Sequence, residues 1–494
     1  KVSKTMIKYQ NFRPFKLLAL IIIPFFASIV FADDAPNLPA GLEENSTSAE
    51  EEPTLPMGLE TVPESEEPAL PKGLSLEQPE KKNAEEKEER FADLPFDLSG
   101  FWEAREGFRT LNDPHEDENS IGETRLQVKI DKVLDYATLK LTGDLVFDSV
   151  LNKHGIDLEK GRGFIDLREM SLLLRPADFI DIKTGRQILT WGTGDLIFIN
   201  DLFPKDWNSF FIGRDTEYLK APSDATRISL FSNVVNLDII YTPRFDTDRF
   251  VDGSRISFFN SKLGMRTGRD FIEDPIIPNN WFVDDEIALR LYKNIGPYEA
   301  AFYGYRGFWK SPAGTDSASG KSTFPELSVY GGSIRGPVGK GIGNIETGYY
   351  NSGDDTGGSD ASVRNSEFRF LTGYEQELAR DFTAGVQYYL EHKIDYNNYL
   401  SSLPSDSPAS DKNRHVLTLR LTKLLEGHNL MLSLFTFYSP SDKDAYLRPK
   451  IHYKIDDHWS AESGANLFIG KDEHTFFGQF EKNSNLYIGA RYGF

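Results

Sequence analysis

The chain has 494 residues, no cysteine and a formal net charge of −21. The absence of cysteine excludes a disulfide framework, a thiolate metal site and a covalent c-type haem. The strongly negative charge argues against nucleic acid as a partner.

Residues 1–32 are predicted to form a secretory signal peptide. Five basic residues precede an apolar run from Leu17 to Val30, which contains Pro24 and is too short to span a membrane comfortably. The run leads into Val30-Phe31-Ala32, a sequence that suits a cleavage site. The alternative is a retained membrane anchor.

Residues 33–96 are predicted to form a disordered acidic arm. They hold eighteen Asp and Glu against five Lys and Arg, a net charge of −13, with recurrent Pro and few apolar residues. Such a segment cannot bury enough apolar surface to offset the entropy lost on ordering. If the barrel that follows begins on the periplasmic side, the arm lies in the periplasm.

The arm carries three copies of the pattern L-P-x-G-L, which begin at Leu38, Leu55 and Leu70. Linked copies of a binding site raise the effective concentration for a partner. We therefore expect the motif leucines to dock a periplasmic partner such as a carrier protein; the alternative is repeat slippage in a low-complexity spacer. The six motif leucines are Leu38, Leu42, Leu55, Leu59, Leu70 and Leu74.

From Asp97 to Phe494 the chain alternates apolar and polar residues in short segments. In 123–130, for example, Leu126, Val128 and Ile130 oppose Glu123, Arg125, Gln127 and Lys129. A soluble sandwich and a membrane barrel share this alternation, but the barrel turns its apolar face to lipid. The predicted strands are 97–110, 120–131, 137–151, 163–175, 180–191, 223–232, 235–244, 285–293, 298–310, 324–335, 341–351, 365–377, 381–394, 413–424, 429–438, 445–455, 459–470 and 485–494.

Three features favour the membrane barrel. The connections alternate between short turns and long loops, as periplasmic turns and outer loops do. The strand count is even, so both ends of the barrel fall on the side of the short turns. The last strand alternates up to a terminal aromatic, Phe494, the type of ending that the barrel-assembly machinery receives. The predicted fold is therefore all-β: a transmembrane antiparallel up-and-down β-barrel of about 18 strands.

Two long connections are predicted to fold inward as a constriction. Residues 192–222 include Phe198, Phe203, Trp207, Phe210 and Phe211, and residues 245–284 include Phe258, Phe259, Phe271, Trp281 and Phe282. Aromatic side chains this dense are costly to leave in water, so we expect them to pack on the barrel wall or on each other.

One segment carries a family resemblance. Gly185-Arg186-Gln187 is followed by Trp191-Gly192, and then by Asn200-Asp201 and Pro204-Lys205-Asp206. With the ending Phe477-Gly478-Gln479 and Asn485-Leu486-Tyr487, it resembles a proteobacterial porin-like outer-membrane β-barrel family of unknown function. The alginate-export barrels are a weaker similarity. The resemblance implies a barrel that passes small or amphiphilic molecules, and supplies no catalytic residues.

Basic residues are predicted to line one side of the lumen. A row of them lies on one strand, and neighbouring strands add others, so a positive wall that favours anions is expected. Nearby acidic residues leave open a neutralised ladder that only stabilises the barrel. The predicted lumen-lining residues are Arg105, Arg109, Arg420, Arg448, Lys450, His452, Lys454 and Arg491.

No cofactor or metal site is predicted. The eight His show no ligand spacing, and no G-x-S-x-G, P-loop or dinucleotide motif occurs. We therefore expect a non-enzymatic protein of the Gram-negative outer membrane, in contact with lipid and lipopolysaccharide. The favoured function is a channel for small anionic or amphiphilic molecules. The alternative is a structural barrel that recruits periplasmic partners. A barrel enzyme is the third hypothesis.

Overall fold

The structure is a computed structural model that describes residues 96–151, 155–405 and 407–494. The predicted signal peptide and the acidic arm with its three L-P-x-G-L motifs lie outside the described residues.

Eighteen strands form one sheet. They are β1 (Asp97–Arg109), β2 (Asn119–Leu134), β3 (Ala137–Asp148), β4 (Ile165–Ala177), β5 (Ile180–Ile188), β6 (Pro222–Leu230), β7 (Asn236–Thr242), β10 (Glu286–Ile295), β11 (Tyr298–Phe308), β14 (Glu326–Val338), β15 (Gly341–Ser352), β16 (Glu367–Ala379), β17 (Phe382–Lys393), β18 (Asn413–Leu425), β19 (Leu430–Ser439), β20 (Asp444–Lys454), β21 (Trp459–Ile469) and β22 (Asn485–Gly493).

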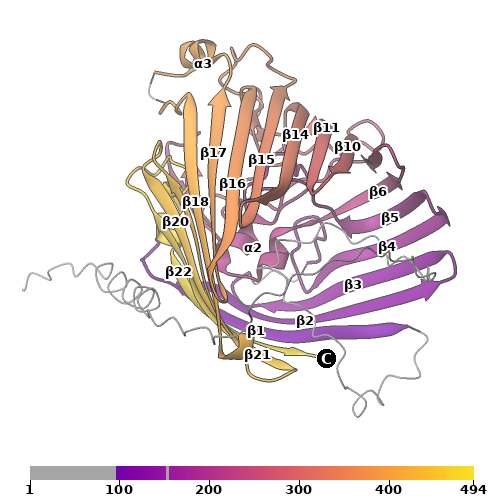
Figure 1. The fold of residues 1–494 in the computed structure, drawn as a ribbon. Helices are drawn as coiled ribbons and strands as arrows, with labels where there is room; N and C mark the ends of the chain where they lie inside the picture. The colour runs from indigo at the N-terminus through magenta and orange to yellow at the C-terminus, as the bar shows by residue number, and fades with distance from the viewer. Residues whose placement is uncertain (1–95, 152–154, 406) are drawn as a thin grey trace, which may run out of the picture. The chain divides into compact units, whose positions relative to one another are not determined.

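The sheet closes into a barrel with simple up-and-down topology (Figure 1). Every strand pairs antiparallel with the barrel strands before and after it in the chain, and β22 closes the ring against β1 with Arg105 opposite Gly489. The predicted 18-stranded antiparallel barrel is confirmed, and each predicted strand overlaps an observed one. Closure leaves no sheet edge with unpaired backbone groups.

The polarity of the barrel is inverted relative to a soluble protein. Inward side chains such as Glu123 and Arg125 on β2 are buried, whereas Leu145 and Phe147 on β3 point outward and are more than half exposed. Burying one Leu or Phe is worth about 1.5–3 kcal/mol, so a belt of them facing water would be strongly unfavourable. The outer surface is therefore that of a barrel surrounded by lipid.

The short and long connections lie at opposite ends of the strands. The loops at the long end contain the hairpins β8 (Phe258–Asn260) with β9 (Met265–Thr267) and β12 (Gly314–Thr315) with β13 (Ser322–Thr323). They also hold α2 (Trp207–Ile212), η2 (Thr216–Leu219), α3 (Tyr396–Ser402) and η4 (Gly478–Asn483), while η3 (Glu426–His428) forms one of the short turns. Among the described residues, no helix has the length and apolar character of a helical membrane span.

The closed barrel should show heat-modifiable mobility in gel electrophoresis. A ring without unpaired edges resists detergent until it is heated, so unboiled and boiled protein should run as two bands, and the unboiled form should give a β-rich circular dichroism spectrum. Deleting β22 should abolish the shift, because β22 closes the ring. A single mobility and extraction without detergent would contradict the barrel.

Candidate functional site

The connection between β5 and β6 runs through the inside of the barrel, and we call residues 189–221 the lumen loop. Its helix α2 lies within the ring of strands in Figure 1. The loop pinches into two lobes, because the amide of Asp206 donates to the carbonyl of Leu219 (2.7 Å) and that of Ala221 to the carbonyl of Pro204 (3.1 Å). Residues 190–204 form the first lobe, and residues 206–219 form the second.

The G-R-Q…W-G motif builds the point where the chain leaves the wall. Gly185 has a φ of +111°, and a Cβ there would lie 2.4 Å from the carbonyl oxygen of Met170, so only glycine fits. The Gln187 amide donates to the Ala225 carbonyl of β6 (2.9 Å). The ring of Trp191 then packs on Phe203 with centroids 5.0 Å apart. The motif therefore positions the lumen loop.

The first lobe is held on the far wall by polar contacts. The buried carboxylate of Glu346 on β15 accepts hydrogen bonds from the backbone and side chain of Thr193 (2.7 and 2.9 Å) and of Asn200 (2.8 and 3.0 Å). Asp195 forms an ion pair with Arg420 on β18, while Gln387 on β17 bonds both its amide and its carbonyl. These three wall residues position the first lobe, whose Ile199 and Phe203 are buried as well.

The second lobe is held by aromatic packing. Phe210 and Phe211 of α2 are buried, and Phe211 lies 5.6 Å from Tyr446, 5.4 Å from Phe468 and 4.8 Å from Phe480 between ring centroids. The Tyr446 hydroxyl also donates to the carbonyl of Phe210 (3.2 Å). Burial of the two Phe side chains stabilises the second lobe far more than this hydrogen bond does, because both rings are removed from water.

The return path of the second lobe follows strands β1 to β3. The Arg105 guanidinium donates to the carbonyl of Gly213 (2.5 Å), and Arg214 forms an ion pair with Glu123 (2.6 Å). The Tyr218 hydroxyl donates to Asp144 (3.0 Å). The aromatic-rich connection 192–222 therefore folds inward, as predicted.

The connection between β7 and β10 also folds inward, but only in part. Its Asp248 accepts from the indole N–H of Trp207 (3.0 Å), and its Arg249 forms an ion pair with Asp166 on β4 (2.7 Å). The predicted contact of aromatics with each other is seen for Trp281 and Phe282, whose ring centroids lie 6.1 Å apart. The predicted inward position is wrong for three aromatics: Phe271, Trp281 and Phe282 are 42, 56 and 70% exposed. Aromatic content alone does not show which part of a loop faces the lumen.

The inner wall is covered all the way round. A buried side chain on a barrel strand must point inward, because nothing covers the outer face, and all eighteen strands carry at least one. Every strand therefore contributes at least one side chain that is covered on the inside of the barrel. One buried residue per strand, in order, is Arg105, Arg125, Asp144, Arg168, Gln187, Ala225, Ile240, Ala288, Tyr305, Val329, Tyr350, Leu371, Tyr389, Val416, Phe437, Tyr446, Phe468 and Tyr487.

Most of the predicted basic row faces acidic partners. Glu462 on β21 contacts Arg105 (2.8 Å), Lys450 (2.5 Å) and His452 (3.8 Å). Glu103 on β1 contacts Arg105 (3.1 Å) and Arg491 (2.9 Å). This cluster has the character of the neutralised ladder rather than of a free positive wall.

The remaining four predicted residues each have different surroundings. Arg109 donates to the backbone carbonyls of Asn119 (2.9 Å) and Arg255, so it holds loops at the long-loop end. Lys454 pairs with Asp457 in the short β20–β21 turn (2.9 Å). Arg420 is taken by Asp195, whereas Arg448 has no carboxylate within ion-pair distance among the described residues and lies over the Phe210 ring at 4.2 Å.

Removing the central carboxylate should destabilise the barrel. In Glu462→Gln, Lys450 loses its ion pair and Arg105 keeps only Glu103, so we expect a loss of about 3–5 kcal/mol in the free energy of unfolding. Denaturant unfolding in detergent measures it, with Glu118→Gln on an exposed loop as the control. Equal stability of the two variants would contradict a structural role for the ladder.

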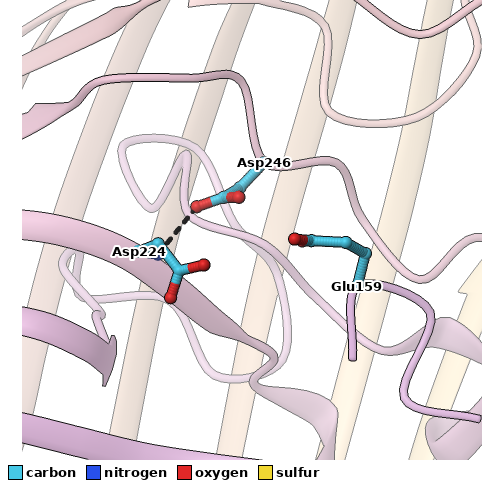
Figure 2. A group of neighbouring side chains, drawn as sticks. All are labelled: Glu159, Asp224 and Asp246. Carbon is cyan, nitrogen blue, oxygen red and sulfur yellow. Dashed lines mark hydrogen bonds between the residues drawn. The ribbon is translucent and has the colours of Figure 1, made fainter. Parts of the chain in front are cut away.

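Glu159, Asp224 and Asp246 come together between two loops and β6 (Figure 2). Their oxygens lie within 4.8 Å of one another. This group was not predicted from the sequence, because the expectation about metal ligands rested on the spacing of the histidines. Each carboxylate already has a donor: Arg244 for Glu159 (2.7 Å), Arg186 for Asp224 (3.0 Å) and the Ser223 hydroxyl for Asp246 (2.7 Å). Arg244 and Arg186 thus balance the charge of Glu159 and Asp224, while the Ser223 hydroxyl satisfies one oxygen of Asp246.

This carboxylate group should make one loop sensitive to pH. Burial, and then the neighbouring carboxylate of Glu286, raises the pKa of Asp246 to about 7. Because the folded value exceeds the unfolded value of about 3.9, the stabilisation that Asp246 gives is lost as pH rises through this interval. Amide exchange in 245–250, corrected for intrinsic rates, should therefore be slower at pH 5 than at pH 8.

Asp246→Asn should remove most of this pH dependence, because the side chain no longer titrates. Asp354→Asn, on another exposed loop, should keep it. An unchanged pH profile in Asp246→Asn would assign the effect to other groups.

No protein-family model matches the chain, and no curated protein matches it in sequence. Among solved structures, OccK11 (OpdR) of Pseudomonas aeruginosa is similar at 8% identity and a TM-score of 0.48, over 80% of this chain and 95% of that one. OccD3 (OpdP) of the same organism gives 11%, 0.45, 80% and 91%. A mutant porin of Rh. blastica gives 10%, 0.36, 81% and 100%. At these values the comparison transfers neither a substrate nor a mechanism.

Proposed function

We propose that this protein is an integral outer-membrane channel of a Gram-negative bacterium, which conducts small anionic or amphiphilic molecules. The observation that carries the proposal is the lumen loop, which crosses a closed barrel that is apolar outside and charged inside. A barrel that only anchors a protein in lipid needs neither a charged lumen nor a loop that polar contacts hold inside it. The presence of such a loop therefore supports controlled passage of small solutes through the barrel.

The anionic preference rests on Arg420 and Arg448. Arg105, Lys450, His452 and Arg491 are occupied by Glu103 and Glu462, so they stabilise the wall. Arg420 and Arg448 are partly exposed and lie beside the two lobes. Basic groups at the narrowest part of a low-dielectric pore raise the local concentration of anions.

The alternative is a structural barrel that recruits periplasmic partners and conducts nothing. The covered inner wall favours it, because a permanently fixed lumen loop would block passage. Planar-bilayer recordings separate the two: a channel gives discrete conductance steps, and a salt gradient gives its ion selectivity from the reversal potential. Folded protein without conductance steps would favour the structural barrel, and cation selectivity would contradict the anionic preference.

The acidic arm adds a second proposed activity, carried by its sequence alone. Its three L-P-x-G-L motifs present paired leucines on a highly charged chain and would dock a periplasmic protein, such as a carrier, at the barrel mouth. A pulldown with the full chain should lose this partner when the six motif leucines are changed to serine. Identical capture by both forms would reduce the motifs to spacer repeats.

A further inference from the structure

We propose that Arg420 and Arg448 form a binding site for small dicarboxylates, that Asp195 of the lumen loop occupies this site as a tethered stand-in, and that an incoming dicarboxylate displaces Asp195 and releases the first lobe. The proposal rests on the channel function proposed above. It assigns to that channel a substrate class and a mechanism of opening.

The contact between Asp195 and Arg420 has the geometry of carboxylate recognition. Both carboxylate oxygens of Asp195 are engaged, Oδ2 by Nε and Oδ1 by Nη2 of Arg420. Two parallel bonds of this kind are the way in which arginine holds a carboxylate ligand. The pair is reachable, because the two side chains remain 13 and 21% exposed. A solute carboxylate can therefore replace the loop's own carboxylate with the same bonds.

Arg448 supplies a second cationic group next to the first. Phe435 on β19 is the cross-strand neighbour of both Arg420 on β18 and Arg448 on β20. The Arg420 guanidinium lies over the Phe435 ring at 4.8 Å, and the Arg448 guanidinium over the Phe210 ring at 4.2 Å. Two strand spacings separate their backbones by about 10 Å. A solute with two carboxylates can engage both arginines, whereas Asp195 engages one.

A third carboxylate weakens the hold of Asp195. Gly385 on β17 is the cross-strand neighbour of both Arg420 and Glu375, and a Cβ on Gly385 would lie 3.4 Å from a carboxylate oxygen of Glu375. Glu375 therefore leans across the glycine toward the same guanidinium. Its negative charge repels Asp195 and competes with any solute that carries only one carboxylate. This arrangement favours dicarboxylates further.

The first lobe is the part of the lumen loop that can be released. Its contacts to Glu346, Gln387 and Arg420 are polar, and water or a solute can replace polar contacts at small net cost. The first lobe also buries Ile199 and Phe203, so its release exposes some apolar surface, but less than release of the second lobe would. The second lobe buries Phe210 and Phe211 in the aromatic cluster, and exposing them is unfavourable. The second lobe therefore stays as an anchor when the first lobe moves.

Cysteine labelling tests the release directly, because the chain contains no native cysteine. Ile199→Cys reports on the first lobe and Ile212→Cys on the second; both isoleucines are buried. Full-length protein in detergent is treated with a maleimide, with or without succinate. We expect succinate, and separately Asp195→Asn, to speed labelling of Cys at 199 by about tenfold through local opening, and to leave position 212 unchanged.

Three results would overturn the proposal. They are labelling at 199 that ignores both succinate and Asp195→Asn, an equal effect of sodium chloride at the same ionic strength, and a full succinate response in Arg448→Gln. Labelling does not require ion flow, so the two proposals fail separately. Conductance with unresponsive labelling would overturn only the dicarboxylate site, and responsive labelling without any conductance would overturn only the channel.

Discussion

Replacing residues 196–216 by a short Gly-Ser linker should raise single-channel conductance several-fold. The deletion removes the tip of the first lobe and the whole of α2, so it uncovers wall residues such as Leu371, Tyr446 and Phe468 that now face the loop. Pore conductance follows the narrowest cross-section, which we expect the lumen loop to set. Planar-bilayer recordings of wild type and variant give the comparison directly.

A matched deletion serves as the control for this experiment. The loop that contains α3 has no buried residue in its helix and lies outside the lumen contacts, so replacing Tyr396–Ser402 by the same linker should leave conductance unchanged. Heat-modifiable mobility confirms that both variants are folded. If the folded 196–216 variant conducts like wild type, the lumen loop is not the constriction.

The barrel could be predicted from the sequence because its information is local. A strand that faces lipid on one side and a polar lumen on the other repeats every two residues, so Leu126, Val128 and Ile130 against Glu123, Arg125 and Gln127 mark β2 without knowledge of its neighbours. Strand order needs no further information, since in an up-and-down barrel each strand pairs with the next. The inward course of the lumen loop followed from its dense aromatics.

The partners of the lumen loop could not be predicted, because they depend on register across the whole barrel. Glu346 lies 153 positions from Thr193, and Gln387 lies 192 positions from Asp195. Nothing local distinguishes Glu346 from other inward glutamates. The same limit explains the basic row: the sequence shows Lys450 and His452 on one strand, but only the register places Glu462 opposite His452. Pairing converts an expected positive wall into an ion-pair ladder.

The exposed aromatics of the connection between β7 and β10 show that aromatic content alone does not place a loop inside the barrel. Trp281 and Phe282 are as apolar as Trp207 and Phe210, yet they are exposed, whereas Trp207 is half-buried and Phe210 is buried. The difference is where the chain is held: Asp206 caps α2 through the amide of Ser209 and so begins the helix inside the barrel, whereas the amide of Phe282 bonds to the carbonyl of Pro243 beside the end of β7. Local anchoring, rather than composition, decides which aromatics enter the lumen.

A disulfide between the first lobe and the wall should close the channel reversibly. A Cβ on Gly348 would lie 2.6 Å from Cγ2 of Ile199, so the side chains at these two positions are in direct contact, and we expect Ile199→Cys and Gly348→Cys to form a disulfide. Oxidation would fix the first lobe against β15. Conductance of the double variant should then fall to the bilayer baseline, and a reductant should restore it.

A second Gly/Ile pair offers a control disulfide that leaves the lumen loop free to move. Gly107 and Ile121 are cross-strand neighbours on β1 and β2, and a Cβ on Gly107 would lie 2.8 Å from Cγ2 of Ile121. Gly107→Cys with Ile121→Cys therefore joins two strands that never separate in a folded barrel, and its oxidation should not change conductance. If the lobe lock, once confirmed by mass spectrometry, also leaves conductance unchanged, solutes pass without movement of the first lobe. The lumen loop would then be a fixed constriction, and its Glu346 contacts would serve stability alone.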